Sequence, residues 1–226
     1  MQALQINLVA VLLALLSLMV YLVTSAPGLE FERQILLFFR HATDLSDPIG
    51  PLWFEEMMRD MTALGSTLVL TLVSLMSVVY LFIQQNKRLA CLIVIAISSG
   101  MLCSYLLKYG FARPRPELVP HGSYVYTSSF PSGHSMLSAL VYFTLAGLFA
   151  RLQQSVKVKI YWYLSAMFLV LMVGISRLYL GVHWPSDVLA GWSAGVLWAL
   201  LWLHIAKRLQ QRGRLNIGSY TRRSVN

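Results

Sequence analysis

Six long runs of apolar residues constrain the fold of this chain more than any other feature of its sequence. They occupy residues 4–23, 64–83, 89–107, 135–150, 160–175 and 188–206. A helix that crosses the hydrocarbon core of a bilayer needs about 20 apolar residues. Four runs approach that length, and a helical turn added at the ends extends the other two. We therefore expect an all-α fold, an integral membrane bundle of six transmembrane helices that forms one domain over residues 1–226.

The composition of the chain agrees with this class of protein. Hydrophobic residues make up 57% of the 226 residues and charged residues only 12%, whereas a soluble domain is about 25% charged. The first run has a second interpretation, because Thr24-Ser25-Ala26 resembles the site at which a signal peptide is cleaved. Residues 1–29 contain no Lys or Arg, however, and a signal peptide begins with a positively charged segment. We favour an uncleaved first helix.

Charged residues are distributed unevenly between the two sides of the predicted bundle. The second connection, the fourth connection and the tail at 207–226 contain basic residues and no acidic ones, whereas all nine Asp and Glu residues belong to the other side. Because cytoplasmic connections are enriched in Lys and Arg, we expect these segments and the C-terminus to face the cytoplasm. The net charge of +9 is then a consequence of membrane topology and does not indicate a nucleic-acid partner.

Two short amphipathic helices are expected on the opposite, outer side, between residues 25 and 63. One covers residues 29–40, and the other carries apolar residues at helical spacing, namely Trp53, Phe54, Met57, Met58 and Met61. Such helices can lie in the headgroup layer. They could border an entrance for a lipid substrate or cap the end of the bundle, and the sequence leaves both interpretations open.

Two smaller features concern packing inside the spans. Gly191 and Gly195 on the last run permit a close approach to another helix, and we expect that contact within the chain rather than in a dimer. Cys91 and Cys103 lie about 18 Å apart along one helix, which is too far for a mutual disulfide.

Three short segments bring polar and charged residues to the outer ends of the runs. On the topology above they fall on the same side of the membrane, although none of them was used to derive it. The first follows the third run, the second opens the fourth run, and the third connects the last two runs. In order, they read Lys108 to Arg115-Pro116, Pro131-Ser132-Gly133-His134, and Ser176-Arg177 to His183 and Asp187.

These residue types suit the binding of a phosphate. Arginine offers a planar fork of donors that matches phosphate oxygens, and lysine adds a compact point charge. Ser132 is a candidate N-cap, and the N–H groups of a helix start attract anions. Gly133 lets a phosphate approach the backbone closely because it has no side chain. The three cations are Lys108, Arg115 and Arg177.

His183 and Asp187 are four residues apart, with Pro185 at the expected start of the last helix. Asp187 could accept a hydrogen bond from one ring nitrogen of His183. That bond would fix the tautomer and leave the other nitrogen free to attack phosphorus. A carboxylate in a first helical turn can also serve only the helix dipole.

The remaining charged and imidazole side chains are interpreted as ordinary interfacial residues. No motif position requires Arg113, so we expect its side chain to snorkel to the membrane surface. His41, His121 and His204 lack comparable neighbours, although His121 is close enough in sequence to the first segment for a minor substrate contact.

The three segments resemble the signature of the type 2 phosphatidic acid phosphatase (PAP2) superfamily. This superfamily also includes bacterial undecaprenyl-pyrophosphate phosphatases and vanadium haloperoxidases. Its signature is Lys-x6-Arg-Pro, Pro-Ser-Gly-His and Ser-Arg-x5-His-x3-Asp, and residues 108–187 fill every position at the right spacing. The resemblance and the expected six-span layout together cover most of the chain.

The resemblance implies a role for each of these residues. His183 would be the nucleophile that forms a phosphohistidine, and Asp187 would orient it. His134 would protonate the leaving oxygen and then activate water. The phosphoryl oxygens would be bound by Lys108, Arg115, Arg177, Ser132 and the backbone of Gly133. The mechanism needs no cofactor and no metal, in agreement with the lack of a second carboxylate beside Asp187.

The expected function is metal-independent hydrolysis of a lipid phosphate or diphosphate. The resemblance to compact bacterial members of the superfamily favours undecaprenyl pyrophosphate over phosphatidic acid and phosphatidylglycerol phosphate. It also implies a bacterial inner membrane, with the site on the outer, periplasmic face that the charge distribution predicts. The expected partners are the lipid substrate and membrane lipids. A phosphotransferase with the same intermediate, such as a lipid A modifying enzyme, and a haloperoxidase remain alternatives. A transporter or channel is disfavoured, because the charges gather at one face instead of crossing the bilayer.

Overall fold

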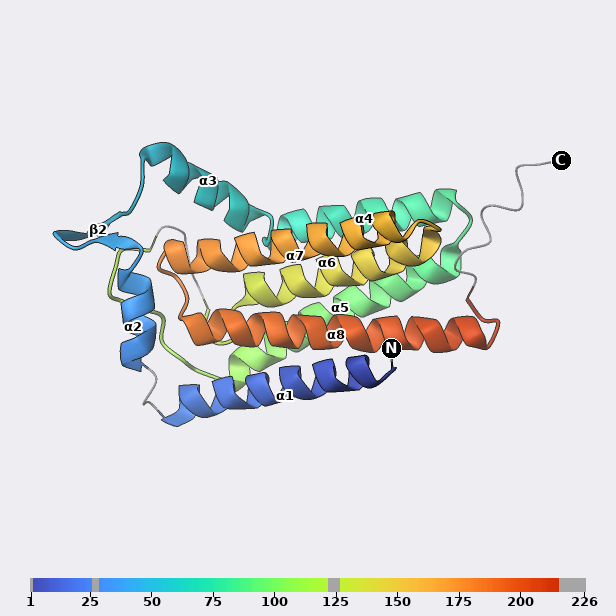
Figure 1. The fold of residues 1–226 in the computed structure, drawn as a ribbon, viewed down its shortest axis with the longest axis horizontal. Helices are drawn as coiled ribbons and strands as arrows, with labels where there is room; N and C mark the ends of the chain where they lie inside the picture. Colours follow the sequence, from blue (N-terminus) through green and yellow to red (C-terminus); the bar gives the residue numbers. More distant parts are fainter. Residues whose placement is uncertain (1, 26–28, 122–126, 216–226) are drawn as a thin grey trace.

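The computed structural model describes residues 2–25, 29–121 and 127–215. Part of the predicted basic tail, residues 216–226, and the last residue of the possible cleavage site, Ala26, lie outside the described residues. Within the described ranges the chain forms helices and a two-stranded sheet (Figure 1). Their bounds are α1 (Gln2–Ser25), α2 (Leu29–Leu37), β1 (Arg40–His41), β2 (Asp44–Pro48), α3 (Leu52–Ala63), α4 (Thr67–Ile83), α5 (Lys87–Gly110), α6 (Gly133–Leu152), α7 (Val156–Tyr179) and α8 (Pro185–Gln211).

The long helices α1 and α4 to α8 contain the six apolar runs, apart from residues 64–66 at the start of the second, and lie side by side along one direction (Figure 1). Helix α6 is at the centre and packs against both α7 and α8. Of the 18 residues in its most apolar stretch, 78% are buried inside the protein, whereas only 22% are buried in the corresponding stretch of α7. The outward faces of the surrounding helices are apolar, as a lipid environment requires.

By length and hydropathy, α5, α6, α7 and α8 can each cross a membrane. Helices α3 and α4 meet at a bend of 52° and satisfy the same criterion as a pair. In α1 the described side chains form a shorter apolar helix, Val9–Tyr21. The predicted helical fold is confirmed, whereas the number of six spans stays a prediction.

The outer segment differs from the sequence prediction in one respect. The first amphipathic helix ends at Leu37 and does not reach residue 40, because the chain turns into the antiparallel pair of β1 and β2. The Asp44 carboxylate at the start of β2 accepts a hydrogen bond from the backbone N–H of Ser46 at 2.8 Å. The ring of Phe39 packs edge-on against Tyr179, 6.0 Å between centroids, so the chain leaves the helix towards α7.

Helix α3 carries the second predicted amphipathic pattern and covers the end of α7. Phe54, Met57 and Met58 pack against the apolar cluster that contains Tyr179 and Val182. This contact supports the interpretation of α3 as a cap on the end of the bundle.

The glycines of α8 bring this helix unusually close to α6. A Cβ atom at Gly191 would lie 2.7 Å from the carbonyl oxygen of Ser132, and one at Gly195 would lie 2.3 Å from that of Met136. The backbone N–H of Ser132 donates to the carbonyl of Asp187 at 3.0 Å. The close approach therefore occurs within the chain, as predicted, and it joins the first turns of two helices that carry motif residues.

Candidate active site

The three motif segments meet at one end of the bundle, where α5 and α7 end and α6 and α8 begin (Figure 1). Between them lies a cavity of about 380 Å³. The described residues that line it are Gly65, Thr67, Met101, Ser104, Tyr105, Lys108, Arg115, Thr127, Gly133, His134, Leu137, Arg177 and His183. Six of the eight predicted site residues therefore face a single cavity, and the other two, Ser132 and Asp187, lie behind it.

The cations are held in place by neutral oxygen atoms. Lys108 Nζ donates to the hydroxyl of Thr127 at 2.9 Å, and Arg115 Nε donates to the carbonyl of the same residue at 2.9 Å. Arg115 Nη1 donates to the carbonyl of Val182 at 2.7 Å. Arg177 Nη1 donates to the hydroxyl of Thr62 on α3 at 2.9 Å. Since these partners carry no negative charge, the positive charge stays available for an anion.

Arg115 illustrates the electrostatic consequence of this arrangement. Burial lowers the pKa of its guanidinium, and the charge of Asp187 partly opposes that change. An arginine starts so far above neutrality that it remains protonated. Several buried cations around one cavity form a site that is stabilised when an anion binds.

His183 lies between a carboxylate and a guanidinium. Its Nδ1 is 3.4 Å from Oδ2 of Asp187, and its Nε2 is 3.2 Å from Nη1 of Arg115. A guanidinium can only donate, so Nε2 is the acceptor and the ring proton belongs on Nδ1, facing Asp187. The side chain is buried, and this burial lowers the pKa of His183 to about 4, against the opposing effect of Asp187. The imidazole is therefore neutral at pH 7, with its Nε2 lone pair on the side of the cations.

The start of α6 forms another wall of the cavity. Ser132 is its N-cap, as predicted, and its hydroxyl accepts a hydrogen bond from the N–H of Ser135 at 3.4 Å. Ser132 is fully buried and is not among the described residues that line the cavity. A Cβ atom at Gly133 would lie 3.2 Å from Cε of Lys108, so the start of α6 packs closely against the lysine side chain. His134 follows directly and faces the same space.

Arg113 is the residue for which the sequence interpretation is wrong. Its side chain does not snorkel to the surface but is only 7% exposed. It bridges two carboxylates, with Nη1 2.6 Å from Oδ1 of Asp187 and Nη2 2.5 Å from Oε2 of Glu32. The sequence contains one local signal of this role, since Arg113 and Arg115 each precede a proline. A residue before proline favours an extended backbone, which places two side chains at this spacing on the same side.

Glu32 and Ser129 were also missed from the sequence. Glu32 was assigned only to a surface helix, yet its side chain is 9% exposed. Ser129 is fully buried, and its hydroxyl donates to Oδ2 of Asp187. Both oxygens of Asp187 therefore have partners besides His183.

The other histidines make contacts unrelated to the cavity. His121 Nε2 donates to the carbonyl of Pro116 at 2.7 Å, His41 lies 3.7 Å from Asp47, and His204 accepts from Arg208 at 2.7 Å. None of the three is among the described residues that line the cavity.

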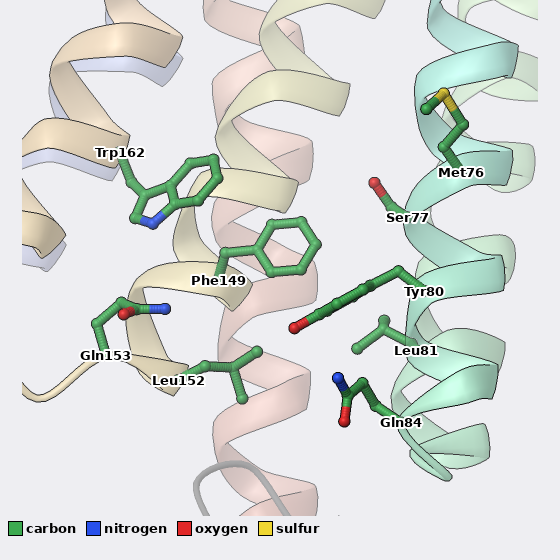
Figure 2. Close-up of a pocket in the computed structure, with 9 residues that line it drawn as sticks. All are labelled: Met76, Ser77, Tyr80, Leu81, Gln84, Phe149, Leu152, Gln153 and Trp162. Atoms are coloured by element: carbon green, nitrogen blue, oxygen red, sulfur yellow. The ribbon is translucent and has the colours of Figure 1, made fainter. Parts of the chain in front are cut away.

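A larger cavity, of about 640 Å³, lies between α4, α6 and α7 near the opposite end of α6 (Figure 2). Phe149 lines it and is about 24 Å along the helix from Gly133. Figure 2 shows the rings of Phe149, Trp162 and Tyr80 around it. Its described lining contains no Lys, Arg, His, Asp or Glu, so it lacks the groups that phosphoryl transfer requires. The described residues also contain no group of three or more His, Cys, Asp or Glu side chains placed to hold a metal ion.

Comparison with known proteins agrees with the geometry of the site. Phosphatidylglycerophosphatase B of Bacillus subtilis is 36% identical over 149 residues, which are 64% of this chain and 71% of that protein. An undecaprenyl-diphosphatase of Sulfolobus acidocaldarius is 30% identical over 120 residues, which are 51% of this chain and 54% of that protein. The crystal structure of a transmembrane PAP2-type phosphatidylglycerolphosphate phosphatase from B. subtilis superposes with a TM-score of 0.74 at 27% identity. The superposition covers 90% of this chain and 96% of the other.

The likeness to that crystal structure confirms the predicted all-α membrane fold. A sequence model of the PAP2 superfamily matches residues 88–211, more than half of the chain, and the match contains all three motif segments. The chain thus belongs to the PAP2 superfamily and is an integral membrane phosphatase.

Proposed function

We propose that this membrane lipid phosphatase hydrolyses its substrate in two steps through a phosphohistidine on His183. One observation carries the proposal. The unprotonated Nε2 of His183 lies at the cavity wall beside Arg115, while Nδ1 is directed at the buried Asp187. The candidate nucleophile and the cations that would attract its substrate thus line one cavity, and the candidate orienting carboxylate contacts the nucleophile from behind.

In the first step, Nε2 attacks phosphorus and the bond from phosphorus to the leaving oxygen breaks. His134 supplies the proton to that oxygen. Arg115 turns from Nε2 to a phosphoryl oxygen, which frees the lone pair for attack. Lys108, Arg177 and the N–H groups at the start of α6 stabilise the negative charge that the transition state spreads over the phosphoryl oxygens.

In the second step, His134 accepts a proton from water, and the resulting hydroxide attacks phosphorus. The bond to Nε2 breaks, its electron pair returns to the ring of His183, and inorganic phosphate leaves. Asp187 stabilises the positive charge of the imidazolium-like ring during both steps, and neither step consumes a cofactor or a metal.

The substrate class follows from the surroundings of the cavity. The cationic side chains that line it can bind a phosphate group, whereas the outward faces of the surrounding helices are apolar and suit hydrocarbon. The substrate is therefore a lipid that carries a terminal phosphate or diphosphate. Undecaprenyl diphosphate and phosphatidylglycerol phosphate are the lead candidates, the first favoured by the resemblance to bacterial members of the superfamily and the second named for the B. subtilis relatives.

The proposed location is a bacterial inner membrane, with the cavity on the periplasmic side and the C-terminus in the cytoplasm. The support is the separation of charge along the bundle. The connections opposite the cavity and the first turns of the helices that follow them contain Lys87, Arg88, Lys157 and Lys159 and no acidic residue, which is the distribution of a cytoplasmic side.

Phosphate release by the purified protein in detergent tests the function. The panel contains undecaprenyl diphosphate, phosphatidylglycerol phosphate, phosphatidic acid and a lipid A phosphate, each with EDTA. The wild-type protein is expected to release phosphate from at least one of them, and the His183→Ala variant from none. Equal release by the variant, or a dependence on added metal, would overturn the proposal.

A further inference from the structure

A chain of buried charges leads from the outer helix α2 to the candidate nucleophile. Glu32 on α2 contacts Arg113 through Oε2 at 2.5 Å, and Arg113 contacts Asp187 at 2.6 Å. Asp187 in turn accepts from Nδ1 of His183. The guanidinium also lies over the indole ring of Trp184, 5.4 Å from its centroid. The fork of Arg113 thus spans two carboxylates that are far apart in the sequence.

The second oxygen of Glu32 is equally occupied. Oε1 accepts hydrogen bonds from the backbone N–H of Ser186, at 2.9 Å, and from the hydroxyl of the same residue. Ser186 lies in the first turn of α8, next to Asp187, and its N–H has no partner within the helix. A carboxylate at this point also interacts favourably with the helix dipole. Glu32 therefore holds the turn that carries Asp187 both directly and through Arg113.

We propose that Glu32 and Arg113 are positioning residues, which fix Asp187 and through it the attacking nitrogen of His183. Neither residue is among the described residues that line the cavity, so neither is expected to touch the substrate. The inference rests on the proposed function, since it concerns the same His183–Asp187 pair.

The need for such a support follows from the burial of Asp187. A charged carboxylate without partners is very costly in a low-dielectric interior, and removal of one member of a buried ion network leaves an uncompensated charge. With one guanidinium between two carboxylates, Asp187 stays ionised and directed at Nδ1. A displacement of this pair by about 1 Å is enough to lower a catalytic rate by about a hundredfold.

Helix α2 has two faces with different surroundings. Its outward residues, such as Phe31 at 70% exposed, can contact headgroups, but its inward carboxylate belongs to the catalytic end of the bundle. On this proposal α2 contributes to turnover through the side chain of Glu32.

The test compares variants that each remove one property of a network side chain. Glu32→Gln removes the charge of the carboxylate, and Arg113→Lys keeps a cation but loses the fork that spans two partners. The matched control is Glu30→Gln, which removes a carboxylate from the same helix. Glu30 pairs with Arg33 at 3.7 Å, and its side chain is 69% exposed. All variants are assayed as full-length protein in detergent micelles, with the panel lipid that the wild-type protein hydrolyses fastest.

The readout is the single-turnover rate constant, because its value does not depend on how much of the preparation is folded, together with KM. Glu32→Gln and Arg113→Lys are expected to lower the rate constant by about ten- to a hundredfold, with KM within about twofold of the wild-type value. Glu30→Gln is expected to match the wild-type protein. The double variant Glu32→Gln/Arg113→Lys should lose no more than the worse single variant, because both changes break one network.

Rate constants equal to that of Glu30→Gln would overturn the inference, and so would a loss that appears only in the amplitude or in KM. These results are distinct from a failure of the proposed function. If the proposed function fails, His183→Ala itself retains turnover. If only the positioning inference fails, His183→Ala is inactive and the Glu32 and Arg113 variants keep the wild-type rate.

Discussion

The guanidinium of Arg115 donates to Nε2 of His183, with Nη1 and Nε2 separated by 3.2 Å. This contact fixes the tautomer, because an arginine cannot accept a hydrogen bond. It also places the strongest phosphate-binding type of side chain against the atom that would attack phosphorus. The proposed mechanism therefore joins phosphate recognition and nucleophilic attack in one pair of residues.

Replacement of Asp187 by Asn should remove most of the activity while the fold survives. The amide has nearly the same shape but carries no negative charge, so the ring loses the carboxylate that fixes its tautomer and stabilises its positive charge. We expect kcat to fall on the order of 10³-fold or more, as in other His–Asp pairs. Steady-state kinetics of the purified variant measure this. A kcat within tenfold of the wild-type value would contradict the assigned role of Asp187.

The protonation of His183 should occur at unusually low pH. Burial disfavours the imidazolium and lowers the pKa of His183 to about 4, against about 6.5 for an unperturbed histidine. The ring is therefore expected to stay neutral from pH 5 upward. Nitrogen NMR of ¹⁵N-histidine-labelled protein measures the midpoint directly, with a His183→Gln sample to identify the resonance. A midpoint near 6.5 would contradict the buried, neutral ring.

The same pKa change has a consequence for stability. Between pH 6.5 and 4 the unfolded chain binds a proton on this histidine and the folded protein does not. The free energy of unfolding should therefore decrease as the pH is lowered through this window. His183→Gln should reduce that decrease, which thermal unfolding in detergent at pH 4.5 and 7 can measure. An unchanged dependence in the variant would show that other groups are responsible.

The close packing of α8 on α6 should be intolerant of a single added methyl group. A Cβ atom at Gly195 would meet backbone, 2.3 Å from the carbonyl oxygen of Met136, whereas Gly110 has nothing within 4 Å. We expect Gly195→Ala to cost about 1–3 kcal/mol of stability, as overpacking does, and Gly110→Ala to be nearly neutral. Thermal unfolding of the two variants makes the comparison. Equal stability would mean that the two helices separate without cost.

The proposed orientation predicts how reporters fused to the C-terminus behave. A fluorescent protein that folds only in the cytoplasm should fluoresce when it follows residue 226, and alkaline phosphatase, which needs the periplasm, should stay inactive there. The reason is the excess of Lys and Arg on the side opposite the cavity. The reverse pattern of reporter activity would place the cavity on the cytoplasmic side.

The helices and the convergence of the motifs could be predicted from the sequence because both depend on local patterns. Apolar runs of near-spanning length define α4 to α8 within a few residues, and Pro185 marks the first residue of α8. The motif residues flank the ends of these runs, so the topology alone brings them to one side. Ser132 as an N-cap is likewise a local property of the chain.

The support of the site could not be predicted in the same way, because it depends on tertiary contacts. Glu32 and Ser186 are 154 positions apart, and no periodicity in either segment indicates that they meet. Arg113 was misread for the same reason. Its spacing fits no motif, and its burial depends on carboxylates from α2 and α8. The short hairpin of β1 and β2 was missed because β1 has only two residues and β2 is mostly polar and exposed, without the alternation that marks a strand.

The most direct test of the account is to trap the intermediate. The protein is mixed with a lipid substrate labelled with ³²P in the scissile phosphate and is quenched in alkali within milliseconds, since phosphohistidine survives alkali and is lost in acid. We predict label on the peptide that contains His183, and no label in His183→Ala. Phosphate release at the full rate without bound label, or label that persists in the His183→Ala variant, would contradict the account.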